Sequence, residues 1–216
     1  PEMFVPLNES ILGRAQNKGV LQINTVYIRD FSLDKHLKCD DAPFGGGAGM
    51  VMTPQPVCDC IKNVDPDHKA HRIYMSPRGK LLTVPIAREY ARKYDWLVIL
   101  CGHYEGIDQR IIDLYIDEEI SIGDFVLTGG ELPAMVLCDV VTRFVPGVLG
   151  CDASSEDESF SDGLLEYPQY TRPQTYEGLS VPEVLLSGHH ENIEKWRREK
   201  SLEITRQNRP DLLEKK

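Results

Sequence analysis

The sequence predicts an α/β fold with a mostly parallel sheet and helices on both faces, and three observations support this. Segments with strand character alternate with segments of helical periodicity. The segment Trp96–Cys101 is continuously apolar, as strands buried on both faces of a parallel sheet are. Three expected strands run into turns at Ser76–Pro77, Gly102–Gly106 and Gly123–Gly130. Because parallel strands end at one edge of a sheet, these turns should lie side by side and form a ligand site.

The elements before the third turn are read from periodicity and composition. Within Val20–Phe31 we expect a strand followed by a turn at Arg29–Asp30, and then a long glycine-bearing loop from Asp34 to Met50. Further along the chain we expect a helix from Thr53 to Asn63 with Thr53 as N-cap, a strand from Arg72 to Met75 followed by a turn at Ser76–Gly79, a helix from Val84 to Lys93, the strand Trp96–Cys101 and a helix from Ile107 to Tyr115. A loop as long as Asp34–Met50 inside a compact domain is more often functional than idle.

The segment Glu119–Pro133 combines apolar residues, a pair of glycines and a proline. We expect a buried strand, a glycine turn at Gly129–Gly130 and a helix with Pro133 in its first turn. The strand should contain Ile120, Ile122, Phe125, Val126 and Leu127, and the helix should bury Leu132, Val136, Val140 and Phe144 before it ends at Pro146–Gly147. Taken alone, a Gly-Gly pair more often marks an ordinary strand-to-helix turn than a ligand site. Neither a G-x-G-x-x-G fingerprint after a strand nor a P-loop is present, so a nucleotide-like ligand would be held in another way.

Bulk composition limits the class of protein. The 216 residues, 41% hydrophobic and 27% charged, suit one sizeable globular domain with a small appendage. No apolar run approaches the roughly 20 residues of a membrane span and no signal peptide is visible, so we expect a cytoplasmic protein without a membrane partner. The spacing of Cys58 and Cys60 does not suit a zinc site, and Cys101 and Cys138 lie in apolar runs as reduced core residues do.

Charge is unevenly distributed towards the carboxyl terminus. The net charge of −10 argues against a uniformly basic nucleic-acid binder, although a local basic patch is compatible with it. Residues 151–166 carry six acids and no base, and we read this stretch as a linker that is mobile until something binds. Beyond it, Pro182–Leu186 and Glu191–Glu203 are expected to be helices, and residues 195–209 are rich in Lys and Arg.

Four motifs carry a resemblance to a known family. They are Phe44–Met50 (FGGGAGM), Cys101–Asp108 (CGHYEGID), Ser121–Pro133 (SIGDFVLTGGELP) and Tyr170–Pro173 (YTRP). From Pro1 to about Pro210 the chain closely resembles the bacterial tRNA (guanine-N1)-methyltransferases, with the motifs in the family's order. The resemblance implies a C-terminal trefoil knot of the SPOUT type, which periodicity would not have indicated, and an obligate homodimer. It also implies an apolar strand before Pro1, which we expect to be missing from this sequence.

The family's architecture implies three regions here. They are a knotted S-adenosylmethionine-binding domain at residues 1–149, a flexible acidic linker at 150–165 and a helical tRNA-binding domain at 166–216. By resemblance, the methyl donor is held by Tyr74, Met75, Ser76, Pro77, Gly102, Glu105, Ile122, Gly123, Phe125, Leu127, Gly129, Gly130 and Pro133. Such a site would place adenine between apolar side chains while backbone groups read its edge. Glu105 could offset the donor's positive charge; taken alone, it could equally be a solvated surface carboxylate.

The resemblance also implies catalytic residues. Transfer to guanine N1 requires a general base for the N1 proton, and the family's base matches Glu158, with Asp157 as the alternative. Arg143 matches an arginine that stabilises negative charge on guanine O6. Taken alone, these acids indicate a solvated linker and Arg143 a surface cation.

The implied activity is methylation of N1 of the guanosine immediately 3′ of the anticodon in tRNA, whose phosphates the basic segment 195–209 would bind. The alternatives are methylation of ribosomal RNA or of a ribose hydroxyl, and an RNA-binding module without catalysis. Arg143 and the linker carboxylate favour the first. The family is associated with magnesium, which makes Mg²⁺ a candidate ion, although no metal-ligand spacing is visible in the sequence.

Overall fold

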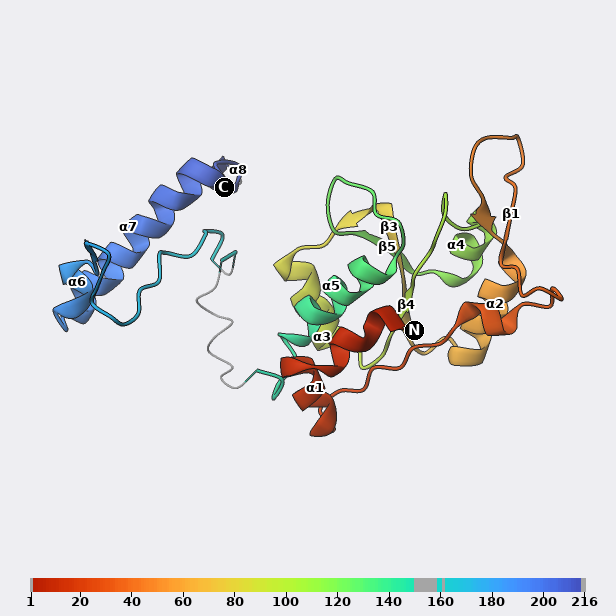
Figure 1. Cartoon of the computed structure of the whole chain (residues 1–216), viewed down its shortest axis with the longest axis horizontal. Coiled ribbons are helices and arrows are strands. Elements are labelled where there is room, and N and C mark those ends of the chain that lie inside the picture. Colours follow the sequence, from red (N-terminus) through yellow and green to blue (C-terminus); the bar gives the residue numbers. More distant parts are fainter. Residues whose placement is uncertain (1, 150–158, 161, 215–216) are drawn as a thin grey trace. The chain divides into compact units, whose positions relative to one another are not determined.

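The computed structural model describes residues 2–149, 159–160 and 162–214 (Figure 1). The chain divides into two compact units, Pro1–Gly150 and Cys151–Lys216. Within the described residues, no helix is both long enough and apolar enough to span a bilayer.

The first unit is an α/β structure. Its elements are η1 (Glu2–Asn8), α1 (Ser10–Asn17), η2 (Ile28–Phe31), β1 (Asp40–Asp41), β2 (Val51–Met52), α2 (Pro54–Val64), β3 (His71–Leu81), α3 (Val84–Lys93), β4 (Leu97–Leu100), α4 (Gln109–Tyr115), β5 (Glu118–Ser121) and α5 (Glu131–Thr142). The main sheet has the order β4-β3-β5, and β3 pairs in parallel with both neighbours. The prediction of a parallel sheet connected by helices is confirmed.

Helices cover both faces of this sheet, with α3 and α5 on one side and α2 and α4 on the other (Figure 1). Successive side chains of a strand point to opposite faces, which explains the two cores. Ile73 and Met75 of β3 pack with Ile120 and Leu137 on the α3–α5 side. Tyr74 packs on the α2–α4 side. Because β3 is buried on both faces, its central residues are apolar without alternation.

The strand expected after Val20 is wrong, whereas the turn expected at Arg29–Asp30 is confirmed. Residues 21–27 have no regular structure, and Ile28–Phe31 form the 3₁₀ turn η2. Val20 and Val26 remain 37% and 48% exposed. A loose alternation of apolar residues specifies a strand only where a neighbouring strand and a core receive them, and these side chains meet neither.

The strand of the third segment is shorter than expected. β5 ends at Ser121, whose hydroxyl donates to Gly123 O (3.0 Å) and accepts from Gly123 N (3.2 Å), and these bonds turn the chain. Phe125, Val126 and Leu127 therefore lie in the turn and are 53%, 81% and 39% exposed. These three side chains therefore lie on the surface of the turn and do not pack in the sheet.

The helix α5 has Pro133 in its first turn, as expected, but it buries a different face. Its buried residues are Ala134, Leu137 and Val141, and it ends at Thr142, before Pro146–Gly147. From the expected stripe, Val140 and Phe144 pack against the core at its margin, whereas Leu132 and Val136 are 45% and 42% exposed.

Two local expectations also need correction. Ser76–Gly79 is not a separate turn, because β3 continues to Leu81 with a shift of register between Met75 and Lys80. Thr53 stands at the N-cap of α2, yet its hydroxyl donates to Cys39 O (3.2 Å) and caps no helix N–H.

The second unit is mainly helical. It contains the antiparallel pair β6 (Thr175–Tyr176) and β7 (Leu179–Ser180), followed by α6 (Glu183–Leu186), α7 (His190–Asn208) and α8 (Asp211–Glu214). The two expected helices are present, and the small hairpin was not predicted. Thr205 of α7 is fully buried, and its hydroxyl accepts from Leu165 N (2.8 Å), which fastens the irregular stretch to the helix.

Candidate ligand-binding site at the carboxyl edge of the sheet

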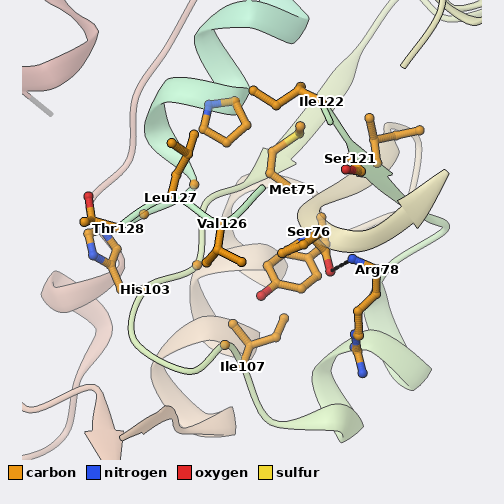
Figure 2. Close-up of a pocket in the computed structure, with 18 of the residues that line it drawn as sticks. Met75, Ser76, Arg78, His103, Ile107, Ser121, Ile122, Val126, Leu127 and Thr128 are labelled. Atoms are coloured by element: carbon orange, nitrogen blue, oxygen red, sulfur yellow. Dashed lines mark hydrogen bonds between the residues drawn. The ribbon is translucent and has the colours of Figure 1, made fainter. Parts of the chain in front are cut away.

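A cavity of about 380 Å³ lies where the parallel strands end (Figure 2). Its walls are Tyr74–Arg78 from β3, Gly102–Ile107 after β4 and the turn after β5 with the start of α5. The three expected segments do converge on one cavity, but Ser76–Pro77 lies within β3 and not at its end. A cavity of this size and mixed lining is typical of sites for small ligands.

The residues that the resemblance assigned to a methyl donor all lie around this cavity. They are Tyr74, Met75, Ser76, Pro77, Gly102, Glu105, Ile122, Gly123, Phe125, Leu127, Gly129, Gly130 and Pro133. Their contact with a ligand stays a prediction. Further lining residues were not predicted: Arg78, His103, Tyr104, Gly106, Ile107, Gln109, Ile120, Ser121, Val126 and Thr128. Most of them are adjacent in sequence to predicted residues of the same turns, and this adjacency is the signal that could have identified them.

Glycines allow the second and third turns to touch. Gly130 N donates to Gly102 O at 2.8 Å. A Cβ added to Gly130 would lie 2.7 Å from Cys101 Cα and 2.8 Å from Gly102 N, closer than real side chains approach backbone. The Gly-Gly pair is thus required by contact between two backbones and not by turn conformation alone.

Tyr74 forms the floor beside the second turn. A Cβ on Gly102 would lie 2.9 Å from the Tyr74 hydroxyl oxygen, so the glycine leaves room for the ring. Tyr74 is 6% exposed, and this burial, helped by the charge of Glu119, raises the pKa of its phenol above the usual value. The hydroxyl therefore stays neutral and can donate a hydrogen bond.

The glycine-bearing loop contacts the site through Glu105. Glu105 N donates to Met50 O (3.0 Å), and a Cβ on Gly49 would lie 2.5 Å from Glu105 Cγ and Oε1. Gly49 also has a φ of +84°, which favours glycine. The end of this loop thus supports a residue that lines the cavity.

Polar side chains stand at two sides of the cavity. His103 and Thr128 lie on one side and Arg78 on the other (Figure 2). Arg78 Nη2 donates to Glu119 Oε2 at 3.3 Å, and its side chain is 63% exposed. His103 Nε2 lies 2.5 Å from Glu131 Oε1.

The predicted catalytic residues are not all brought to this cavity. Arg143 is the half-buried C-cap residue of α5 and does not line it. Glu158 and Asp157 lie outside the described residues. Among the described residues, no group of three or more His, Cys, Asp or Glu side chains is arranged to hold a metal ion.

Thiol chemistry is not supported at the site. Burial raises the pKa of Cys101 to about 12 and that of Cys138 to about 11, so both thiols stay protonated at neutral pH. Both are free cysteines, as is expected of core residues.

The geometry defines an α/β protein with a small-molecule pocket at the carboxyl edge of a parallel sheet. Its walls combine apolar side chains with bare glycine backbone, which suits a nucleoside-sized ligand. The residues therefore fit a methyl donor such as S-adenosylmethionine, which needs both a slot for its adenine and backbone groups at the adenine edge.

Comparison with known proteins gives the family. The family model described as tRNA (Guanine-1)-methyltransferase TrmD matches residues 1–215. Similar proteins named tRNA (guanine-N(1)-)-methyltransferase occur in Ruminiclostridium cellulolyticum (61% identical, covering 100% of this chain and 93% of the relative), Clostridium botulinum (60%, 100% and 89%) and Clostridium perfringens (58%, 100% and 90%). The chain belongs to this tRNA (guanine-N1)-methyltransferase family, and the resemblance seen in its motifs is confirmed.

Proposed function

We propose that the chain transfers a methyl group from S-adenosylmethionine to N1 of the guanosine immediately 3′ of the anticodon in tRNA. The observation that carries the proposal is the convergence of two glycine-bearing turns and the middle of β3 on one cavity, in a chain about 60% identical to enzymes of that name. The substrate and the methylated position are inferred from the family, and the cavity supports the binding of a methyl donor.

The donor would be held mainly by the third turn. Bound S-adenosylmethionine supplies an activated methyl group on a sulfonium. Ile122, Leu127 and Pro133 offer apolar surface for the adenine, and the glycine backbone of the second and third turns lines the same cavity, where it would lie at the adenine edge. The Glu105 carboxylate lines the same cavity, where it would offset the donor's positive charge.

The acceptor must lose a proton as it gains the methyl group. The carboxylate of Glu158 takes the N1 proton of guanine, with Asp157 as the alternative base. The Arg143 guanidinium stabilises the negative charge that develops on guanine O6. These roles rest on the family match.

The second unit would bind the tRNA backbone. On α7, Lys195 and Arg206 are exposed, and Arg198 and Lys200 pair with exposed acids, Asp162 and Glu203. Exposed pairs of this kind contribute about 0–1 kcal/mol, so RNA phosphates can replace the carboxylates at little cost. Affinity should then fall steeply with salt.

The family's homodimer and trefoil knot are part of the proposal. Leu132 and Val136 lie one turn apart on α5 and are nearly half exposed, which suits an apolar face that a second copy covers. A Cβ on Gly79 would lie 2.4 Å from the backbone of Glu119 and Ile120. Only glycine fits this close approach of β3 to β5, and the knot itself is inferred from the family. Magnesium remains a candidate ion.

The test is methyl transfer with labelled S-adenosylmethionine. Two tRNA transcripts should be compared that differ only in guanosine or adenosine at the position 3′ of the anticodon. We expect label only in the guanosine transcript, recovered as 1-methylguanosine. Equal labelling of both would contradict the proposed position, and transfer to ribosomal RNA or to ribose would favour another member of the same fold class. No labelling at all, with donor and tRNA both bound, would indicate an inactive RNA-binding module.

The base is tested by two isosteric variants. Glu158→Gln and Asp157→Asn should be compared in single turnover at saturating donor. We expect Glu158→Gln to slow transfer by about two to four orders of magnitude, the usual contribution of general base catalysis. If only Asp157→Asn abolishes transfer, Asp157 is the base.

A further inference from the structure

A histidine and a glutamate join two walls of the pocket through their side chains. His103 lies in the second turn, and Glu131 in the first turn of α5, at the end of the third. The imidazole Nε2 lies 2.5 Å from the carboxylate Oε1, a short contact of the kind made by charge-assisted hydrogen bonds. Glu131 has only 17% of its side chain exposed, whereas His103 has 45%.

Gly129 lies directly beneath this pair. A Cβ on Gly129 would lie 2.5 Å from Glu131 Oε2 and 3.0 Å from His103 Cε1. An isolated antiparallel bridge also joins His103 to Gly129. The ring and the carboxylate therefore cover the backbone of the glycine turn, on the side of the pocket where Figure 2 shows His103.

Glu131 carries its carboxylate at the amino-terminal end of a helix. It stands in the first turn of α5, a helix of twelve residues, where the positive end of the helix dipole stabilises a carboxylate. Its charge acts on Cys101, whose pKa burial raises first and Glu131 raises further. The pair thus connects the carboxylate of Glu131 on α5 to the imidazole of His103 in the second turn.

We propose that the His103–Glu131 pair is a positioning device that fixes the spacing between the second and third turns and so sets donor affinity. This inference rests on the proposed function, because it gives the pocket a methyl donor. Neither side chain is assigned to the methyl group or to guanine. The backbone contacts between the turns remain without the pair, so its loss should loosen the pocket and leave the fold intact.

Donor affinity in a double-mutant cycle tests the inference. Dissociation constants for S-adenosylhomocysteine should be measured by calorimetry for the wild type, His103→Ala, Glu131→Ala and the double variant. We expect each single variant to bind about fivefold to tenfold more weakly, because a partly exposed charged hydrogen bond contributes modestly. The double variant should bind no more weakly than either single one, since both remove the same contact.

A conservative variant and a matched control separate positioning from a general loss of structure. His103→Gln keeps an N–H donor near the position of Nε2 and should restore most of the affinity. Glu89→Ala removes an exposed glutamate of another helix, which is paired with Lys93 on α3, and should leave binding unchanged. In steady state, the KM for the donor should rise for Glu131→Ala while kcat and the KM for tRNA stay nearly constant. The melting temperatures without ligand should be similar across the set.

Three results would overturn the inference. One is wild-type affinity in both single variants. Another is additive losses in the double variant, which would mean that the side chains act separately. The third is a fall in kcat at unchanged donor KM. If the wild type itself binds no S-adenosylhomocysteine, the assignment of the donor fails and not the role of the pair.

Discussion

The two ends of the main sheet are built for different tasks. At the amino-terminal end of β3, Arg72 and Asp65 are 3% and 1% exposed, and Arg72 Nε donates to Asp65 Oδ2 at 2.8 Å. Arg72 Nη2 also donates to Asp65 O, and the amides of Lys69 and Ala70 complete the shell of the carboxylate. At the carboxyl-terminal end, glycine turns surround a cavity and leave large apolar side chains such as Val126 exposed.

Side chains on the α3 side extend the polar network of the amino-terminal end. Glu118 of β5 accepts hydrogen bonds from the Tyr90 hydroxyl and from Lys80 Nζ, and His71 Nε2 lies 3.3 Å from it. The His71 ring stacks on Tyr94 with centroids 4.1 Å apart. The difference between the ends teaches that stability is concentrated where polar groups are saturated, which leaves the opposite edge free to open towards a ligand.

The largest effect should come from breaking the buried pair. Asp65→Ala leaves Arg72 buried without its carboxylate, and we expect a loss of about 3–5 kcal/mol in the free energy of unfolding. Urea denaturation measures it. Asp67→Ala, which removes an exposed partner of Lys69, should change stability by less than about 1 kcal/mol. The folded fraction of Asp65→Ala should still bind S-adenosylhomocysteine. A loss of binding without a loss of stability would contradict the division of tasks between the two ends.

A smaller effect on stability, with a large effect on binding, is expected at the opposite edge. Gly130→Ala pushes a methyl group against Cys101 and Gly102, which separates the two turns. We expect a loss of about 1–3 kcal/mol in stability and at least a tenfold loss of donor affinity. Calorimetric titration with S-adenosylhomocysteine measures the second. Wild-type affinity in this variant would show that the contact between the turns does not shape the donor site.

Acid should weaken the amino-terminal end gradually. Burial by itself raises the pKa of Asp65, Asp117 and Glu118, but hydrogen bonds to the ionised carboxylates outweigh it and leave each pKa below its usual value. These carboxylates therefore contribute their full stabilisation at a pH above their pKa values in the unfolded chain, which are near 3.8 for Asp and 4.5 for Glu. The stabilisation is lost as the pH falls through their lower pKa values in the folded chain.

Urea midpoints between pH 7 and pH 3 measure this loss. From pH 7 to pH 5 the contribution of these carboxylates should be nearly constant, and by pH 4 we expect a loss of roughly 1 kcal/mol. The difference between wild type and Asp65→Asn should narrow as the pH falls. A difference that widens would mean that Asp65 is not held ionised by its partners.

The sequence predicted the parallel sheet and the convergence of turns because these depend on local patterns. Val84–Lys93 was predicted with the bounds that α3 has, since its periodicity and the two flanking strands agree. Local patterns failed where the structure of a segment depends on what packs against it. The segment Val20–Phe31 has strand-like residues but no neighbouring strand in the described part of the chain. Leu132 has the helical spacing of a core residue, yet its side chain remains exposed on α5.

Contacts between distant residues were beyond reach of the sequence. Nothing local marks Asp65 as the partner of Arg72, or His103 as the partner of Glu131, because each pair forms only when strands, turns and helices meet. The pocket residues were predicted through the family motifs, and His103 lies within one of these motifs, but its contact with Glu131 is visible only in the folded turns. The passage of Gly79 against β5 likewise depends on tertiary structure.

Hydrogen exchange with and without S-adenosylmethionine tests the central contrast most directly. We predict that the donor slows amide exchange in residues 102–106 and 122–130, which line the cavity, and leaves residues 65–72 unchanged, since those amides are already protected in the folded chain. Equal slowing at both ends, or protection confined to residues 65–72, would contradict the assignment of donor binding to the carboxyl edge of the sheet.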